Sequence, residues 1–231
     1  MKNLLLITIS LLLSMMSYGQ KENKTLDDYL PIDSIPGKYS INKIVHLDSL
    51  KESEIEKKAT MFTKTDKEKF FITNGQRNQG WSAFAGVKKN QDKGDVNDAK
   101  RDIGFDSYDS ETKTLLAHAL FRNEGSTMGC IKLMIIKCDI IIQFKDGKTK
   151  ISITNFSYRH YNISTGEEQP IYGSDRGDCK SKATLEELSR CNHCENRKEE
   201  IFKFVNKSSM DIIKQYEEYM ISKSSVLKSD W

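Results

Sequence analysis

Residues 130–158 read CIKLMIIKCDIIIQFKDGKTKISITNFSY, two long runs of strand-forming residues on either side of Asp146-Gly147. From Cys130 to Lys145, apolar side chains recur at alternate positions. Because successive side chains of a strand point to opposite faces, this alternation predicts a strand with one apolar face. Asp-Gly between two such runs indicates a tight hairpin. The stretch therefore predicts two long antiparallel strands, the second over residues 148–158.

Further strands and helices flank this hairpin. Alternating apolar residues predict strands at 39–47, 103–109 and 114–122. Ser53 and Glu56 form a capping box that indicates a helix at 50–64. An apolar stripe at helical spacing predicts a second helix at 198–222. The order strand, helix, four strands, helix predicts an α+β fold, a five-stranded antiparallel sheet with two helices packed on one face.

The N-terminus has the features of a secretory signal peptide. Lys2 precedes an apolar run from Leu4 to Met16, and Ser17-Tyr18-Gly19 predicts cleavage before Gln20. No later stretch has the roughly 20 apolar residues that a transmembrane span needs. We therefore expect an exported protein, periplasmic or extracellular, with no transmembrane segment in the mature chain.

The rest of the chain fits one domain. After the signal peptide at 1–19 we expect a flexible lead-in at 20–30, an α+β domain at 31–223 and a tail at 224–231. Two segments that interrupt the periodicity, 66–101 and 159–197, are interpreted as insertions. The chain has 36 basic and 33 acidic residues, and this near balance argues against nucleic acid as a partner. We expect a monomer or a weak oligomer.

Several short motifs accompany this pattern. They are Pro31–Asp33, Pro36–Lys38, the charged capped helix at 50–64, the turn Asp146-Gly147-Lys148 and the run Ile151–Phe156. Together with the signal peptide, these motifs resemble those of the family called domain of unknown function 4468. Its members are secreted bacterial proteins. The resemblance covers most of residues 30–222 and implies a TATA-binding-protein-like fold. The family has no established activity, and the name of its fold implies shape rather than DNA binding.

The chain has five cysteines, three of which lie in the second insertion. Cys179, Cys191 and Cys194 are interpreted as forming a structural disulfide, either Cys179 to Cys191 or Cys179 to Cys194. In one alternative, Cys179, Cys191, His193 and Cys194 hold a zinc ion. In another, the Cys-x-x-Cys motif is a dithiol redox centre. Cys130 and Cys138 share a strand face with apolar residues, so we expect buried thiols there.

Strand alternation also predicts which side chains face away from the helices. These are His46, Asp106, Tyr108, His118, Thr154, Phe156, Tyr158 and His160. Aromatic rings and imidazoles on an open sheet face are typical of a binding surface. The candidate binding residues are therefore Tyr108, His118, Phe156 and Tyr158, with Trp81 from the first insertion. An ordinary half-polar sheet face in contact with water has the same composition.

No catalytic signature stands out. The sequence has no nucleophile elbow, HExxH motif, phosphate-binding glycine loop or dinucleotide fingerprint. We assign no catalytic residue and expect no cofactor. The sequence favours a non-catalytic envelope protein that binds another envelope macromolecule or a ligand. A thiol or zinc protein centred on the cysteine cluster, and an uncharacterised hydrolase, are the alternatives.

Overall fold

The computed structural model describes residues 25–31, 37–65, 67–74, 103–127, 130–162, 168, 181–191 and 195–222. Its strands are β1 (Ser40–His46), β2 (Phe71–Asn74), β3 (Gly104–Asp109), β4 (Thr114–Thr127), β5 (Cys130–Lys145), β6 (Lys148–Asn162) and β7 (Lys182–Thr184). Its helices are α2 (Leu26–Tyr29), α3 (Glu52–Thr65), the 3₁₀ helix η1 (Lys67–Phe70), α5 (Leu185–Ser189) and α6 (Glu195–Ile221).

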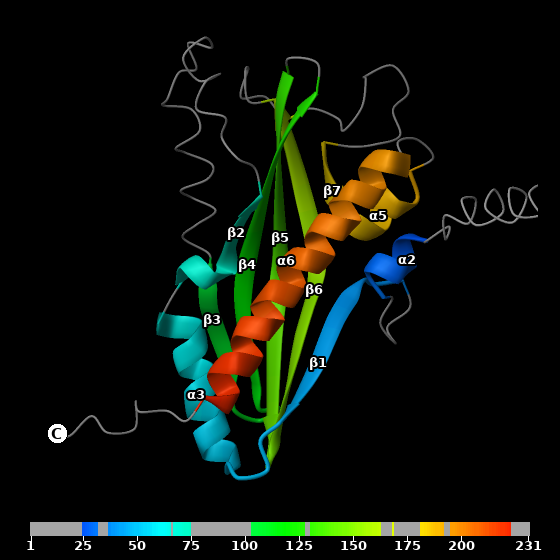
Figure 1. The fold of residues 1–231 in the computed structure, drawn as a ribbon. Coiled ribbons are helices and arrows are strands. Elements are labelled where there is room, and N and C mark those ends of the chain that lie inside the picture. The colour runs from blue at the N-terminus through cyan, green and yellow to red at the C-terminus, as the bar shows by residue number, and fades with distance from the viewer. Residues whose placement is uncertain are drawn as a thin grey trace, which may run out of the picture.

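These elements form an α+β fold around one curled sheet. The described strands follow the order β1-β6-β5-β4-β2, while β3 also pairs with β4 and β7 with β6. Figure 1 shows the two main helices, α3 and α6, on the same side of this sheet. The predicted fold class, an antiparallel sheet with two helices on one face, is confirmed.

The hairpin of β5 and β6 forms where the sequence predicted it. The strands pair from Lys145 and Lys148 outward, and Gly147 of the turn has a φ of 70°. The Asp146 carboxylate accepts a hydrogen bond of 3.0 Å from the backbone N–H of Glu52. The hairpin turn thus also holds the first turn of α3.

Two short strands join the five predicted ones. β2 runs parallel to β4, and β7 pairs antiparallel with β6. With four and three residues, they are too short to show a diagnostic alternation. The parallel pair of β2 and β4 is the single exception to antiparallel pairing among the described strands.

The core lies between the sheet and the two helices. Phe62 of α3 is at the centre of an aromatic cluster, with ring centroids 5.5 Å from Phe70 and 5.2 Å from Tyr216. The hydroxyl of Tyr216 lies 2.8 Å from the hydroxyl of Thr149 on β6. Burial raises the pKa of Tyr216, so this hydroxyl stays neutral and its hydrogen bond joins α6 to the sheet.

The N-terminal segment contains a short helix. Residues 26–29, inside the predicted lead-in, form α2. The hydroxyl of Tyr29 donates to Glu199 of α6 at 2.9 Å, and the side-chain amide of Asn206 donates to the Tyr29 carbonyl. Leu30 is fully buried, so α2 is anchored on α6.

No helix in the described part of the chain is long and apolar enough to cross a membrane. The predicted signal peptide at residues 1–19 and the tail at 224–231 lie outside the described residues.

Candidate functional site

A β-bulge in β6 changes which of its side chains face the helices. The pairing with β5 moves from Lys137 opposite Ser157 to Asp139 opposite Thr154, which gives β6 one extra residue. Asn155, within this bulge, has a φ of 54°. An extra residue exchanges the two faces of a strand.

The bulge explains why part of the open-face prediction is wrong. Phe156 and Tyr158 have exposed fractions of 0% and 1%, so they are core residues rather than binding residues. His160 is buried in the same way. Burial, with the nearby Glu187 carboxylate, raises the pKa of Tyr158 to about 12.

A second bulge lies in β3. The pairing with β4 moves from Phe105 opposite Ala117 to Ser107 opposite Leu116, so Asp106 is the extra residue. Tyr108 then lies opposite the buried Leu115. Its ring centroid is 5.9 Å from that of Phe144, and burial together with Glu56 of α3 raises its pKa. The prediction that Tyr108 faces away from the helices is therefore wrong.

His118 does face away from the helices, as predicted, and it is half-buried. Its Nδ1 lies 2.9 Å from Oδ1 of Asp139 on β5, and its Nε2 lies 3.8 Å from Oδ2 of Asp106. An ionised carboxylate only accepts hydrogen bonds, so Nδ1 carries the proton. With a neutral ring, Nε2 is then a hydrogen-bond acceptor beside Asp106.

The hydrogen bonds continue beyond Asp139. The side-chain amide of Asn155 donates to Oδ2 of Asp139 at 2.7 Å. The amide oxygen of Asn155 accepts a hydrogen bond of 3.1 Å from Nζ of Lys38. Both oxygens of Asp139 are therefore engaged. We call Lys38, Asp106, His118, Asp139 and Asn155 the His118 cluster.

A cavity of about 470 Å³ opens beside the cluster. Four cluster members line it, namely Asp106, His118, Asp139 and Asn155, together with Leu120 and Ser157. Its volume falls in the range of sites for small ligands. When the His118 ring is neutral, its Nε2 and the carboxylate of Asp106 place two acceptors side by side there, which suits a ligand with hydrogen-bond donors such as hydroxyl or amino groups.

The described cysteines differ in state. Cys138 is a buried free thiol, as predicted. Burial raises its pKa, so it is unreactive. Cys191 is buried and disulfide-bonded, and its carbonyl accepts a 2.7 Å hydrogen bond from the buried Lys198.

The zinc alternative requires Cys191 as a thiolate, a state that it does not have here. The predicted pairing of Cys179 with Cys191 stays a prediction, since Cys179 lies outside the described residues, as do His193, Cys194 and Trp81. Within the described residues, no group of three or more His, Cys, Asp or Glu side chains could hold a metal ion.

Sequence reasoning did not assign Asp139, Asn155 or Lys38 to the site. The one available signal was Asn155, an asparagine in the middle of a strand-forming run. Asparagine is depleted in strands and adopts positive φ more readily than most residues. Such a residue indicates a bulge.

The fold matches solved structures of bacterial proteins. A DUF4468 family protein from Bacteroides ovatus aligns with a TM-score of 0.50 and 8% identity, over 88% of this chain and 99% of that chain. A TBP-like protein from Parabacteroides distasonis aligns with a TM-score of 0.46 and 12% identity, over 83% and 97%. No protein-family model and no curated protein matches the chain. At such identity the match to the DUF4468 family protein shows a shared fold alone, which agrees with the resemblance noted in the sequence.

Proposed function

We propose that this chain is an exported, non-catalytic binding protein of the bacterial envelope, and that the His118 cluster is its ligand site. The observation that carries the proposal is the convergence of two bulges on one histidine. The bulged residue of β3, Asp106, lies beside Nε2 of His118. The bulge of β6 contains Asn155. Its side-chain amide donates a hydrogen bond to the Asp139 carboxylate, which also accepts from Nδ1 of His118.

Both bulges interrupt the hydrogen bonding of the sheet, and Asn155 adopts a backbone conformation that is unfavourable for most side chains. Bulges are enriched next to binding and active sites, where they re-aim a side chain. A stability cost at two neighbouring points, where Asp106 lies beside His118 and Asn155 bonds the Asp139 carboxylate, favours a site over an ordinary solvated face.

The arrangement supports binding more than catalysis. Among the described residues, the one hydrogen bond of His118 goes to Asp139, and no hydroxyl or thiol is bonded to Nε2 for activation as a nucleophile. The two adjacent acceptors, Nε2 and Asp106, would instead hold the donors of a polar ligand. The signal-peptide features of residues 1–19 support an envelope location.

The test is an NMR screen of the mature protein against a panel of amino acids, tripeptides and oligosaccharides. We expect a donor-rich compound to shift the ring signals of His118 and the amide of Asn155. The variant His118→Ala should bind that compound at least about tenfold more weakly. Its thermal unfolding should stay close to that of the parent protein, because the histidine is only half-buried.

Gln143→Ala is the matched control, since Gln143 is an exposed residue of β5 that does not line the cavity. It should bind as the parent protein does. Binding that is unchanged in His118→Ala, or signals that shift only on the helix side of the sheet, would contradict the proposal.

A further inference from the structure

The strand at one end of the sheet, β1, has an outer edge that no described strand covers. β1 stands first in the strand order and pairs with β6 alone among the described strands. Figure 1 shows it at the margin of the sheet, beyond α6, with α2 beside its first residues. The part of β1 that follows, towards His46, is the open edge.

Every second residue of β1 directs its backbone N–H and C=O away from β6. The N–H of Ser40 points outwards, because it donates to the carbonyl of Pro31, outside the sheet, at 3.0 Å. The register of β1 with β6 is unbroken, and an antiparallel ladder alternates strictly. Asn42, Ile44 and His46 therefore share this outward direction. No described residue outside the sheet bonds the backbone of these three.

An apolar side chain stands in the middle of this edge. Ile44 has an exposed fraction of 52%. Its neighbour Lys43 lies 3.7 Å from Glu217 of α6, and its other neighbour, Val45, is buried, so Ile44 points to the face away from the helices. Proteins commonly protect a free sheet edge with a charged side chain. An exposed isoleucine at this position favours a contact site instead.

Three lysines lie beside Ile44 on the same face. Lys150 of β6 is directly opposite Ile44, and Lys148 is opposite His46. Lys145 of β5 is opposite Lys148 in turn. The side chains of directly opposed residues share a face of the sheet. None of the three lysines forms an ion pair with a described residue, so an acidic partner could neutralise them.

Several carboxylates at this end of the sheet are engaged elsewhere. Asp146 accepts a hydrogen bond from the backbone N–H of Glu52 at the start of α3. The Glu52 carboxylate lies 3.6 Å from Lys113. Asp109 accepts a hydrogen bond of 2.7 Å from the hydroxyl of Thr112. These carboxylates leave the lysines beside Ile44 available to a partner.

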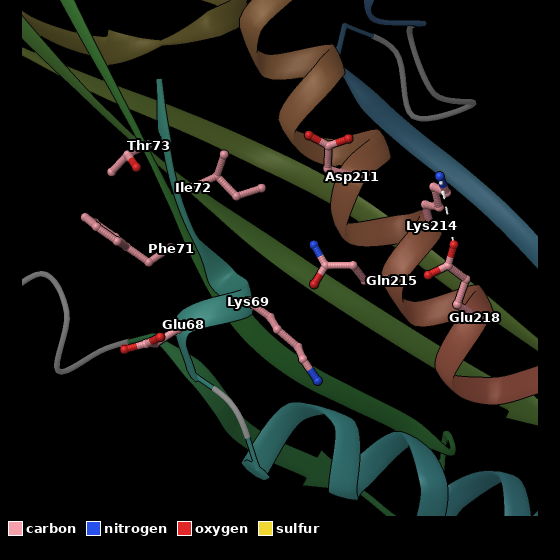
Figure 2. A pocket seen from close by; sticks show the side chains of 9 residues that line it. All are labelled: Glu68, Lys69, Phe71, Ile72, Thr73, Asp211, Lys214, Gln215 and Glu218. Carbon is pink, nitrogen blue, oxygen red and sulfur yellow. Dashed lines mark ion pairs between the residues drawn. The ribbon is translucent and has the colours of Figure 1, made fainter. Parts of the chain in front are cut away.

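The opposite end of the sheet has mixed charges. There a cavity of about 590 Å³ lies between β2 and α6. Figure 2 shows two amines and three carboxylates in its lining, those of Lys69, Lys214, Glu68, Asp211 and Glu218. Lys214 is 3.9 Å from Glu218. Because the charges there nearly cancel, we expect an acidic partner to select the β1 end.

We propose that the outer edge of β1 binds an extended, acidic peptide segment of another protein. The peptide adds to the sheet as a further strand and hydrogen-bonds the outward backbone groups of Asn42, Ile44 and His46, as in other complexes formed by strand addition. An apolar side chain of the peptide packs on Ile44, and the flanking Asp or Glu side chains lie towards Lys148 and Lys150. This site is separate from the His118 cluster.

The probe is a fluorescein-labelled, capped peptide of the sequence Thr-Glu-Thr-Val-Thr-Glu-Thr, titrated into the mature protein and followed by fluorescence anisotropy. One comparison peptide has Lys in place of both Glu, which reverses its charge. The other carries methyl groups on the backbone nitrogens of its Glu and Val, which prevents strand pairing and keeps the charge. We expect each comparison peptide to bind at least about tenfold more weakly. Amide shifts in NMR spectra should map the probe to β1 and β6.

Lys148→Glu should weaken binding of the probe by about fivefold, because it replaces an attraction by a repulsion at an exposed position. Lys57→Glu makes the same charge change at an exposed position of α3, and it should change the affinity by less than about twofold.

Sedimentation velocity tests the other possible occupant, a second copy of this chain. We expect the protein to remain a monomer at the concentrations used for binding. A dimer that excludes the probe would assign the edge to self-association and overturn the proposal. Equal binding of the probe and either comparison peptide, an unchanged affinity in Lys148→Glu, amide shifts confined to β2 and α6, or the absence of binding would overturn it as well.

Discussion

Replacing Phe156 with alanine is expected to lower the free energy of unfolding by about 3–5 kcal/mol, the usual cost of truncating a fully buried phenylalanine. The ring of Phe156 has an exposed fraction of 0%, because the bulge at Asn155 turns it towards the helices. Urea denaturation followed by circular dichroism measures this change. The expected loss is a large part of the stability of an ordinary domain.

Ser157→Ala is the neighbouring control. Ser157 is half-buried and lines the cavity on the opposite face, so its replacement should change the free energy of unfolding by less than about 1 kcal/mol. If Phe156→Ala had an equally small effect, Phe156 would face water and β6 would have no bulge.

Replacing Asn155 with valine is expected to cost about 2 kcal/mol. Asn155 has a φ of 54°, and a left-handed backbone costs ordinary L-residues roughly 1–2 kcal/mol, more for a β-branched one. The change also removes the hydrogen bond from Asn155 to Asp139. The same denaturation experiment measures the loss.

Asn155→Gly separates the two contributions, because glycine adopts positive φ without strain. It should cost less than about 1 kcal/mol, while still removing the amide that bonds Asp139. If valine and glycine cost the same, the backbone at position 155 is not left-handed, and the bulge is not as described.

Most of the fold could be predicted from the sequence. The five strands show their alternation directly, and Asp146-Gly147 marks the central hairpin. The two main helices show an apolar stripe. The capping box predicted at Ser53 and Glu56 is wrong, because α3 begins at Glu52, and Glu54 caps its start through the backbone N–H of Lys51. These are local signals, each contained within one element.

The composition of the open face could be predicted only in part, because counting alternate residues assumes that every strand is regular. One extra residue in β6 and one in β3 exchange the faces of the residues beyond them. Counting alternate residues therefore assigned His118 to the correct face of the sheet, and it assigned Tyr108, Phe156 and Tyr158 to the wrong face.

The His118 cluster itself required the register between strands. Asp139 lies opposite His118 across the pairing of β4 and β5, and nothing near either residue in the sequence specifies that pairing. Lys38 and Asn155 are 117 residues apart and meet only in the folded sheet. Contacts of this kind depend on tertiary structure, which local periodicity does not encode.

The most direct test of the account is the protonation state of the His118 ring, read from long-range ¹H–¹⁵N NMR correlations at alkaline pH. We expect a proton on Nδ1, because Asp139 accepts its hydrogen bond at 2.9 Å, and none on Nε2. Asp139→Asn should change this distribution, because an amide can also donate a hydrogen bond to Nδ1. A neutral ring protonated on Nε2 in the parent protein, unchanged in Asp139→Asn, would contradict the account.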